Sequence, residues 1–220
     1  MTTYRVSALA FGFLRMWRAW TIVVPVVIVN AAVQALLIWP DPTPTLNTLA
    51  IIIAVLSGLA FVLSYGLVAS ASLHVADGRT DWHAALRTLR AHGLRFLIWG
   101  ALLAIVVIIG LAAYTLPGLV IVALTPFVLL AALDGRRNPL GTNLHVIGRH
   151  FWRWLVTTLI TGAILLLAPV AGDLTSFFVR GSLAAFGIWL VTGAVISWFT
   201  VTWALIYRSA LAPESTAPAA

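Results

Sequence analysis

The chain has 220 residues, of which 62% are apolar and only 9% are charged, and its mean hydropathy is +1.05. A soluble domain carries about 25% charged residues, and a disordered chain combines high charge with low hydropathy, so the composition excludes both classes. Each helical crossing of a membrane uses about 20 residues, which leaves room for about six crossings and no separate soluble catalytic domain. The predicted fold class is therefore all-α, a polytopic helical membrane protein.

Six apolar segments follow one another along the chain and are the expected transmembrane helices. They are residues 20–39, 49–72, 96–115, 119–133, 154–171 and 182–207. The fourth is short and contains Pro126, and Leu116-Pro117-Gly118 before it predicts a very tight connection. Together they form a single membrane domain, residues 1–211, and the Pro-, Ala- and Ser-rich residues 212–220 are expected to be a disordered tail. Arg5, Arg15 and Arg18 interrupt the N-terminal segment, so no cleavable leader is expected.

The positive charges predict the orientation in the membrane. All 13 basic residues are Arg, and the net charge is +7. In the segments before, between and after the predicted spans, 12 of the 13 fall on one side and only Arg180 on the other. The positive-inside rule makes the Arg-rich side cytoplasmic, with both termini on it. We therefore attribute the high net charge to contact with a membrane surface and expect no nucleic-acid partner.

Three basic amphipathic helices are expected on the cytoplasmic side, each just before a span. Their apolar stripes recur at helical spacing, and such helices typically lie in the headgroup plane. The stripes are Val6, Leu9, Phe13, Trp17 and Trp20; Trp82, Leu86 and Leu89; and Leu140, Leu144, Ile147 and Phe151. Asp81 is a candidate N-cap for the second helix.

The three helices also share a spacing that predicts an internal repeat. Each contains Leu, five residues, a basic residue or His, two residues and Arg. The three instances are Leu9/Arg15/Arg18, Leu86/His92/Arg95 and Leu144/His150/Arg153, and Asp-Gly-Arg occurs at both 77–79 and 134–136. The second and third instances lie 58 residues apart and the two Asp-Gly-Arg motifs 57 apart. Both spacings favour three units, each an in-plane helix followed by a transmembrane hairpin.

Candidate catalytic and metal-binding groups are few, so no enzyme activity, cofactor or metal is expected. The chain has no Cys or Lys, and its only Glu, Glu214, lies in the tail. Asp77 and Asp134 each precede Gly and Arg, which is typical of turns. No two of the five His have the i, i+4 spacing of a helical zinc site, and they are expected to contact lipid headgroups. No nucleotide-binding loop of the Gly-x4-Gly-Lys type can exist without Lys.

Two amides on one face of the first span, Asn30 and Gln34, are the intramembrane candidates. An amide facing lipid is costly, so both are expected to face protein. Hydrogen bonding between helices is the simpler explanation. A polar cavity for a lipid headgroup or a peptide is the alternative.

The order of these elements resembles a known bacterial family. The motifs that carry the resemblance are Leu116-Pro117-Gly118, Thr125-Pro126-Phe127, residues 138–154 and residues 199–211 with Tyr207-Arg208. They are similar to the six-span membrane domain of glycerophosphoryl diester phosphodiesterase and to the YciC-like membrane proteins. The resemblance implies a bacterial plasma membrane protein. The phosphodiesterase domain itself has no counterpart here, so its activity is not carried over.

The function expected from the sequence is that of a non-enzymatic membrane protein that engages anionic lipid at the cytoplasmic leaflet, as an accessory or subunit in envelope or lipid physiology. The expected headgroup-binding residues are Arg15, Arg18, Arg87, Arg90, Arg95, Arg149 and Arg153. A protein partner or a homo-oligomer is compatible with this function. The alternative is a membrane subunit of a lipid or peptide transporter that is powered by a separate ATPase chain.

Overall fold

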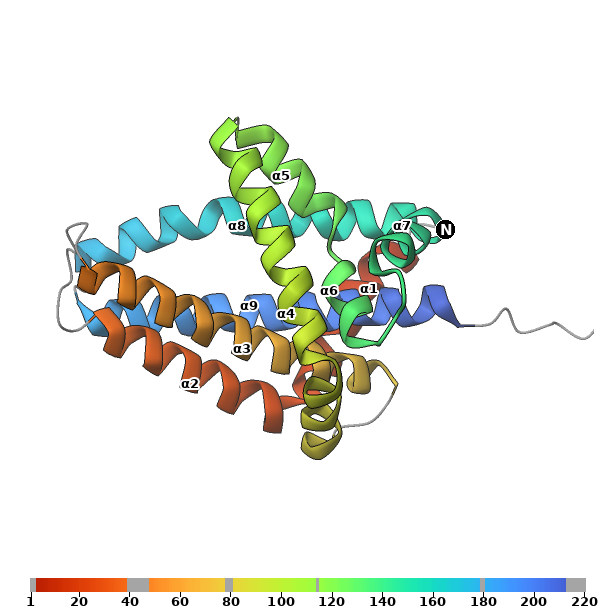
Figure 1. The fold of residues 1–220 in the computed structure, drawn as a ribbon, viewed down its shortest axis with the longest axis horizontal. Coiled ribbons are helices and arrows are strands. Elements are labelled where there is room, and N and C mark those ends of the chain that lie inside the picture. The colour runs from red at the N-terminus through yellow and green to blue at the C-terminus, as the bar shows by residue number, and fades with distance from the viewer. Residues whose placement is uncertain (1–2, 39–47, 78–80, 114, 179–180, 213–220) are drawn as a thin grey trace, which may run out of the picture.

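The computed structural model describes residues 3–38, 48–77, 81–113, 115–178 and 181–212, and every regular element among them is an α-helix (Figure 1). These elements are α1 (Thr3–Arg18), α2 (Trp20–Ile38), α3 (Thr48–Ala76), α4 (Trp82–Ala113), α5 (Thr115–Leu124), α6 (Val128–Leu133), α7 (Pro139–Arg149), α8 (Phe151–Phe178) and α9 (Ser182–Leu211). The predicted all-α class is confirmed. Arg79, Arg180, the Pro-rich residues 40–44 and the tail from residue 213 lie outside the described residues.

Four helices are long and apolar enough to cross a membrane by length and composition. They are α2 over Trp20–Leu37, α3 over Thr48–Ala76, α4 over Trp82–Ala113 and α9 over Ser182–Leu211. The protein is therefore a multi-pass helical membrane protein with four candidate spans among the described residues. The 28-residue helix α8 covers the fifth expected span, although the side chains of residues 165–178 lie outside the described part.

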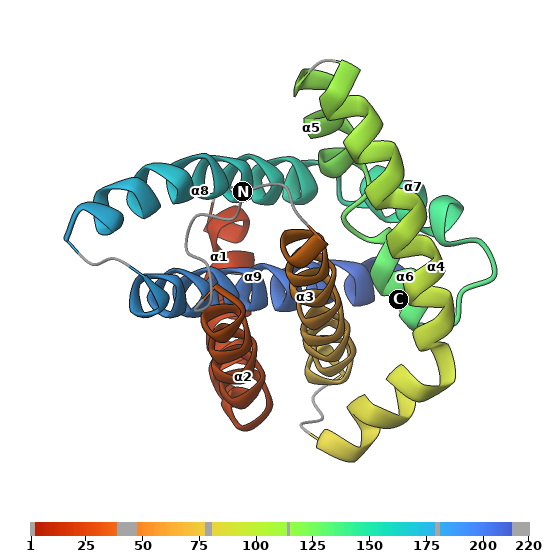
Figure 2. The same cartoon turned by 60° about the vertical axis from the view of Figure 1, so that its left-hand side comes forward.

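Helix α9 is the central element of the bundle, with α2 and α3 on one side and α8 on the other (Figures 1 and 2). It packs against α1, α2 and α3. The crossing with α2 is close because Gly193 has no side chain: a Cβ there would lie 2.9 Å from Cγ1 of Val27. The indole Nε1 of Trp198 donates to the carbonyl oxygen of Leu9 at 2.9 Å. The last helix of the chain thus fixes the position of the first.

Helices α4 and α5 form a hairpin that crosses the direction of α2, α3 and α9 at a steep angle (Figure 1). Gly110 and Gly118 allow the two helices to touch, since a Cβ on Gly110 would lie 2.9 Å from the backbone N of Gly118. The expected connection at Leu116-Pro117-Gly118 is misplaced: these residues belong to the first turn of α5. Pro is tolerated there because first-turn N–H groups have no intrahelical partner.

Two expected boundaries in the middle of the chain are wrong. The amphipathic helix 82–89 is continuous with the third span as the single helix α4, which bends along its length (Figure 2). The fourth span, 119–133, is interrupted at residues 125–127 and consists of α5 and α6. The cause is Pro126, which has no N–H and whose ring clashes with the preceding turn. The chain therefore re-enters the bundle core as the short buried helix α6.

The break at residues 125–127 is closed by side chains from α7 and α8. Asn143 of α7, which is 1% exposed, accepts from the backbone N–H of Phe127 at 3.0 Å and donates to the carbonyl of Leu124 at 2.8 Å. Nε1 of Trp154 donates to the carbonyl of Ala123 at 2.9 Å. Buried backbone groups are costly when unpaired, so these side chains replace the hydrogen bonds that Pro126 removes.

Candidate functional site

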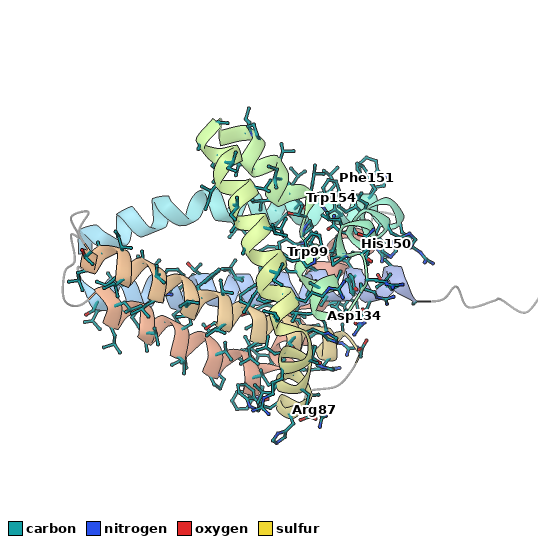
Figure 3. The ribbon with its side chains drawn as sticks, in the orientation of Figure 1. Arg87, Trp99, Asp134, His150, Phe151 and Trp154 are labelled. Carbon is teal, nitrogen blue, oxygen red and sulfur yellow. The ribbon has the colours of Figure 1, made fainter. Side chains whose placement is uncertain are left out.

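The strongest electrostatic feature is a cluster where the ends of α3, α6 and α9 meet. Arg208 of α9 contacts Asp134 through Nη1 and Oδ1 at 2.7 Å, and Asp77 through Nη2 and Oδ2 at 3.0 Å. We call this end of the bundle, marked by Asp77, Asp134 and Arg208, the basic end. Figure 3 shows Asp134 there, beside α6 and α9. One guanidinium thus joins the ends of two helices that are far apart in sequence.

Asp134 accepts from two further donors. Its Oδ2 accepts from Nε of Arg136 and from the hydroxyl of Tyr207, both at 2.9 Å. The hydrogen bond to Asp134 raises the pKa of Arg136, because the carboxylate stabilises the charged guanidinium. The side chain of Asp134 is only 14% exposed. Two cations and a hydroxyl therefore compensate a largely buried carboxylate.

A small pocket of about 150 Å³ adjoins this cluster. His74, Thr88, His92, Asp134 and Arg208 line it together with two Leu side chains. Nε2 of His74 and Oγ1 of Thr88 are 2.9 Å apart and hydrogen-bonded. Within the described part of the chain, no group of three His, Asp or Glu side chains is placed to hold a metal ion. The pocket is polar, but its charged groups already pair with one another.

Three of the seven arginines expected to bind lipid headgroups donate to backbone carbonyls at or just beyond helix ends. Arg15 donates to the carbonyl of Val75 at 3.4 Å. Arg95 donates to the carbonyls of Gly135 and Arg137 at 3.2 and 2.8 Å, and Arg149 donates to the carbonyl of Ala210 at 2.8 Å. C-terminal carbonyls of helices have no intrahelical donor and carry partial negative charge. Arg15 and Arg149 therefore stabilise the last turns of α3 and α9, and Arg95 holds the loop that follows α6.

The other four arginines make fewer contacts within the protein. Arg18 and Arg90 are exposed, and Arg153 is partly buried. Arg87 is exposed and makes a long ion pair of 3.7 Å with Asp81; in Figure 3 it points away from the bundle. Exposed pairs of this kind contribute about 0–1 kcal/mol. Arg18, Arg87 and Arg90 thus keep their charge at the surface.

The predicted amphipathic helices differ in how well their burial follows the predicted apolar stripes. In the N-terminal part of α4, Ala85 is buried while His83, Arg87 and Arg90 are exposed, and Asp81 caps the helix by accepting from the N–H of His83 at 2.9 Å. The predicted N-cap is confirmed. In α7 the protein-facing side chains are Asn143, Val146 and Ile147, whereas three members of the predicted stripe face outward. These are Leu140, Leu144 and Phe151, which are 42%, 65% and 45% exposed.

Both intramembrane amides are buried, at 5% exposure for Asn30 and 2% for Gln34. Gln34 joins α2 to α3, since its Nε2 donates to the carbonyl of Ser57 at 3.0 Å and its Oε1 accepts from the Ser57 hydroxyl. Asn30 lines a cavity of about 30 Å³ with Ser64 and Tyr65, and its Oδ1 has no protein partner among the described residues. Gln34 therefore makes the expected helix–helix hydrogen bond, and Asn30 faces a space the size of one water molecule.

The sequence indicated turns at Asp77 and Asp134 but not their pairing with Arg208. The repeated Asp-Gly-Arg motif and the Tyr207-Arg208 pair were the available signals. The role of Asn143 was also missed, because it depends on a break in another helix.

No family model matches the chain, and no curated protein or solved structure matches it either. The resemblance to the six-span bacterial family therefore stays a prediction.

Proposed function

We propose that this chain is a non-enzymatic integral membrane protein that engages anionic phospholipid at the cytoplasmic leaflet. The observation that supports the proposal is the exposure of three arginines at the ends of candidate spans: Arg18 lies just before α2, and Arg87 and Arg90 lie in the N-terminal part of α4. Basic side chains beside apolar spans attract anionic headgroups.

The energy of such contacts is small for each arginine and adds up over several. Each basic residue near an anionic surface contributes about 1 kcal/mol, and the attraction falls off within a Debye length. The three exposed arginines together therefore provide about 3 kcal/mol at physiological ionic strength. Arg15, Arg95 and Arg149 contribute less to lipid binding, because their guanidinium groups donate to backbone carbonyls.

This division gives a test with a matched control. One triple variant replaces Arg18, Arg87 and Arg90 with Gln, and the other replaces Arg15, Arg95 and Arg149 with Gln. Native mass spectrometry in mixtures of phosphatidylglycerol and phosphatidylcholine measures retained lipid, and thermal unfolding measures stability. We expect the first variant to lose phosphatidylglycerol selectivity at unchanged stability, and the second to lose stability first. Unchanged selectivity in the first variant would refute the proposal, and a stoichiometric ATPase in the purified complex would favour the transporter alternative.

The proposal includes six crossings with both termini cytoplasmic, in three units. Support for the three units comes from the basic end, where Arg15, Arg95 and Arg149 each donate to the final turn or the loop of the second helix in their own unit. The absence of Cys allows single-cysteine labelling to test the topology. Leu116→Cys and Ser182→Cys should react with an impermeant maleimide from outside the cell. Arg90→Cys and Arg137→Cys should react only after the membrane is opened, and a protected Leu116→Cys would contradict six crossings.

A further inference from the structure

An apolar groove lies between α1, α2 and α9 and has a volume of about 430 Å³. Trp17 and Trp20 lie at one end, and Val24, Ile28, Val191 and Val195 line it further along. Its lining is almost entirely apolar. The volume falls within the range of about 300–1,000 Å³ that is typical of sites for small ligands.

The position of the groove limits what can occupy it. Its walls belong to α2 and α9, which are both candidate spans, so the groove opens toward hydrocarbon rather than water. From Trp20 to Ile28 the helix rises about 12 Å at 1.5 Å per residue. One leaflet has a hydrocarbon thickness of about 15 Å, half that of the bilayer core. The groove therefore matches the length of an acyl chain within a single leaflet.

The Trp end of the groove offers a place for a headgroup. Trp17 and Trp20 are 66% and 56% exposed, and Trp side chains favour the membrane interface, where the indole N–H can donate to polar groups. Arg18 lies between them in sequence and is exposed, and no carboxylate in the described part of the chain pairs with it. Arg18 does not line the groove, but it directly follows Trp17, which does. A cation beside the tryptophan end of an apolar groove complements a lipid with an anionic phosphate.

We propose that the groove between α1, α2 and α9 binds one anionic glycerophospholipid, with an acyl chain against Val24, Ile28 and Val191 and the phosphate at Arg18. This site rests on the proposed function and gives it a location. Lipid tails are as apolar as Leu side chains, so an acyl chain gains little by moving from the bilayer to the groove. Selectivity for the bound lipid therefore comes from Arg18, and its loss costs about fivefold in affinity, which corresponds to about 1 kcal/mol.

The test uses the intact protein in nanodiscs with phosphatidylglycerol that carries a photoreactive diazirine on its acyl chain. Cross-linked peptides are mapped by mass spectrometry. In the wild type we expect adducts within residues 16–28 and 190–195. The variants Val24→Trp and Val191→Trp fill the groove at positions that are 40% and 64% exposed, so the fold should persist while these adducts fall at least fivefold. Leu59→Trp on α3, which is 51% exposed, is the matched control and should leave them unchanged.

Arg18→Gln should lower the adducts from phosphatidylglycerol about fivefold and leave those from a phosphatidylcholine probe unchanged. Arg137→Gln, which removes an exposed charge near Asp134, is the control and should affect neither set at the groove. Adducts spread evenly over the lipid-facing helices would overturn the groove site. So would protein–protein cross-links at the groove, which would show that a second copy covers it. If the groove site fails but native mass spectrometry still shows selective retention of phosphatidylglycerol, the proposed function stands. If that selectivity is also absent, the proposed function and the groove site are both refuted.

Discussion

Arg208 contacts Asp134 at 2.7 Å although the two residues are 74 positions apart in sequence. Asp134 is the more buried of the two aspartates that Arg208 contacts, with a side-chain exposure of 14% against 41% for Asp77. A hydrogen bond to a charged group that is shielded from water contributes more than one at the surface. The end of α9 is therefore held mainly by α6 and secondarily by α3.

Asp134→Asn should lower the free energy of unfolding by about 2 kcal/mol, because Arg208 and Arg136 lose their shared carboxylate. Asp77→Asn is the control and should cost about 0–1 kcal/mol, as for an exposed pair. Equilibrium unfolding in mixed micelles measures both values. Equal effects of the two substitutions would contradict the greater weight that we give to Asp134.

The pH dependence of stability should include a contribution from His150. Burial, and to a smaller extent the charges of Arg153 and Arg149, lower its pKa from the ordinary value of 6.5. Between the folded and unfolded pKa values the unfolded state binds more protons, so stability rises with pH. His150 therefore makes its full contribution above about pH 6.5 and loses it as the pH falls toward the lower, folded pKa.

His150→Gln should flatten this part of the profile. The measurement is thermal unfolding from pH 5 to pH 8 for the wild type and the variant. His83→Gln is a suitable comparison because His83 lies exposed at the start of α4. A His150 variant with the wild-type slope would show that other groups cause the dependence.

Asn143→Leu should cost about 3 kcal/mol, since it leaves the N–H of Phe127 and the carbonyl of Leu124 without their partner. The second Asn of this region, Asn138, caps α7 by accepting from the N–H of Gly141 at 2.9 Å. Asn138→Ala should cost only about 1 kcal/mol, as is usual for an N-cap. Chemical unfolding ranks the two, and the reverse order would rule out the role given to Asn143 at the break.

Gly110→Ala should destabilise the α4–α5 hairpin by about 1–3 kcal/mol, because the added methyl group meets the backbone of Gly118. Gly58→Ala in α3 is the matched control, since a Cβ there has no neighbour within 4 Å. It should be neutral or slightly stabilising through helix propensity. Limited proteolysis near residue 114 and thermal unfolding report on the two variants, and a neutral Gly110→Ala would show that the helices separate easily.

Local patterns predicted the features that depend on local chemistry. Hydropathy placed α2, α3 and α9 within a few residues, and the position of Asp81 before an apolar stripe indicated the start of α4. The break at Pro126 could have been predicted from the sequence, because Pro interrupts helices. The side chain that stabilises the break could not have been predicted, because Asn143 lies 16 residues from Phe127 in sequence. Nothing in the sequence around Asn143 indicates that it pairs with Phe127.

Long-range features depended on packing that no sequence period describes. The direction of the α4–α5 hairpin follows from the Gly110–Gly118 contact and from the bend in α4, not from hydropathy. The roles of the seven candidate arginines also depend on packing, because their sequence contexts are similar. Only the fold separates Arg95 and Arg149, which donate to backbone carbonyls, from Arg87 and Arg90, which stay exposed.

The central place of α9 has a consequence for synthesis. Chains are made from the N-terminus, and domains fold as their contacts become available. Helices α1, α2 and α3 find their main partner in the last helix of the bundle, and Trp198 meets Leu9 across 189 positions. The first helices therefore remain inserted in the bilayer but not assembled until α9 has left the ribosome. A nascent chain stopped before residue 182 has its earlier membrane segments but not the helix that brings them together.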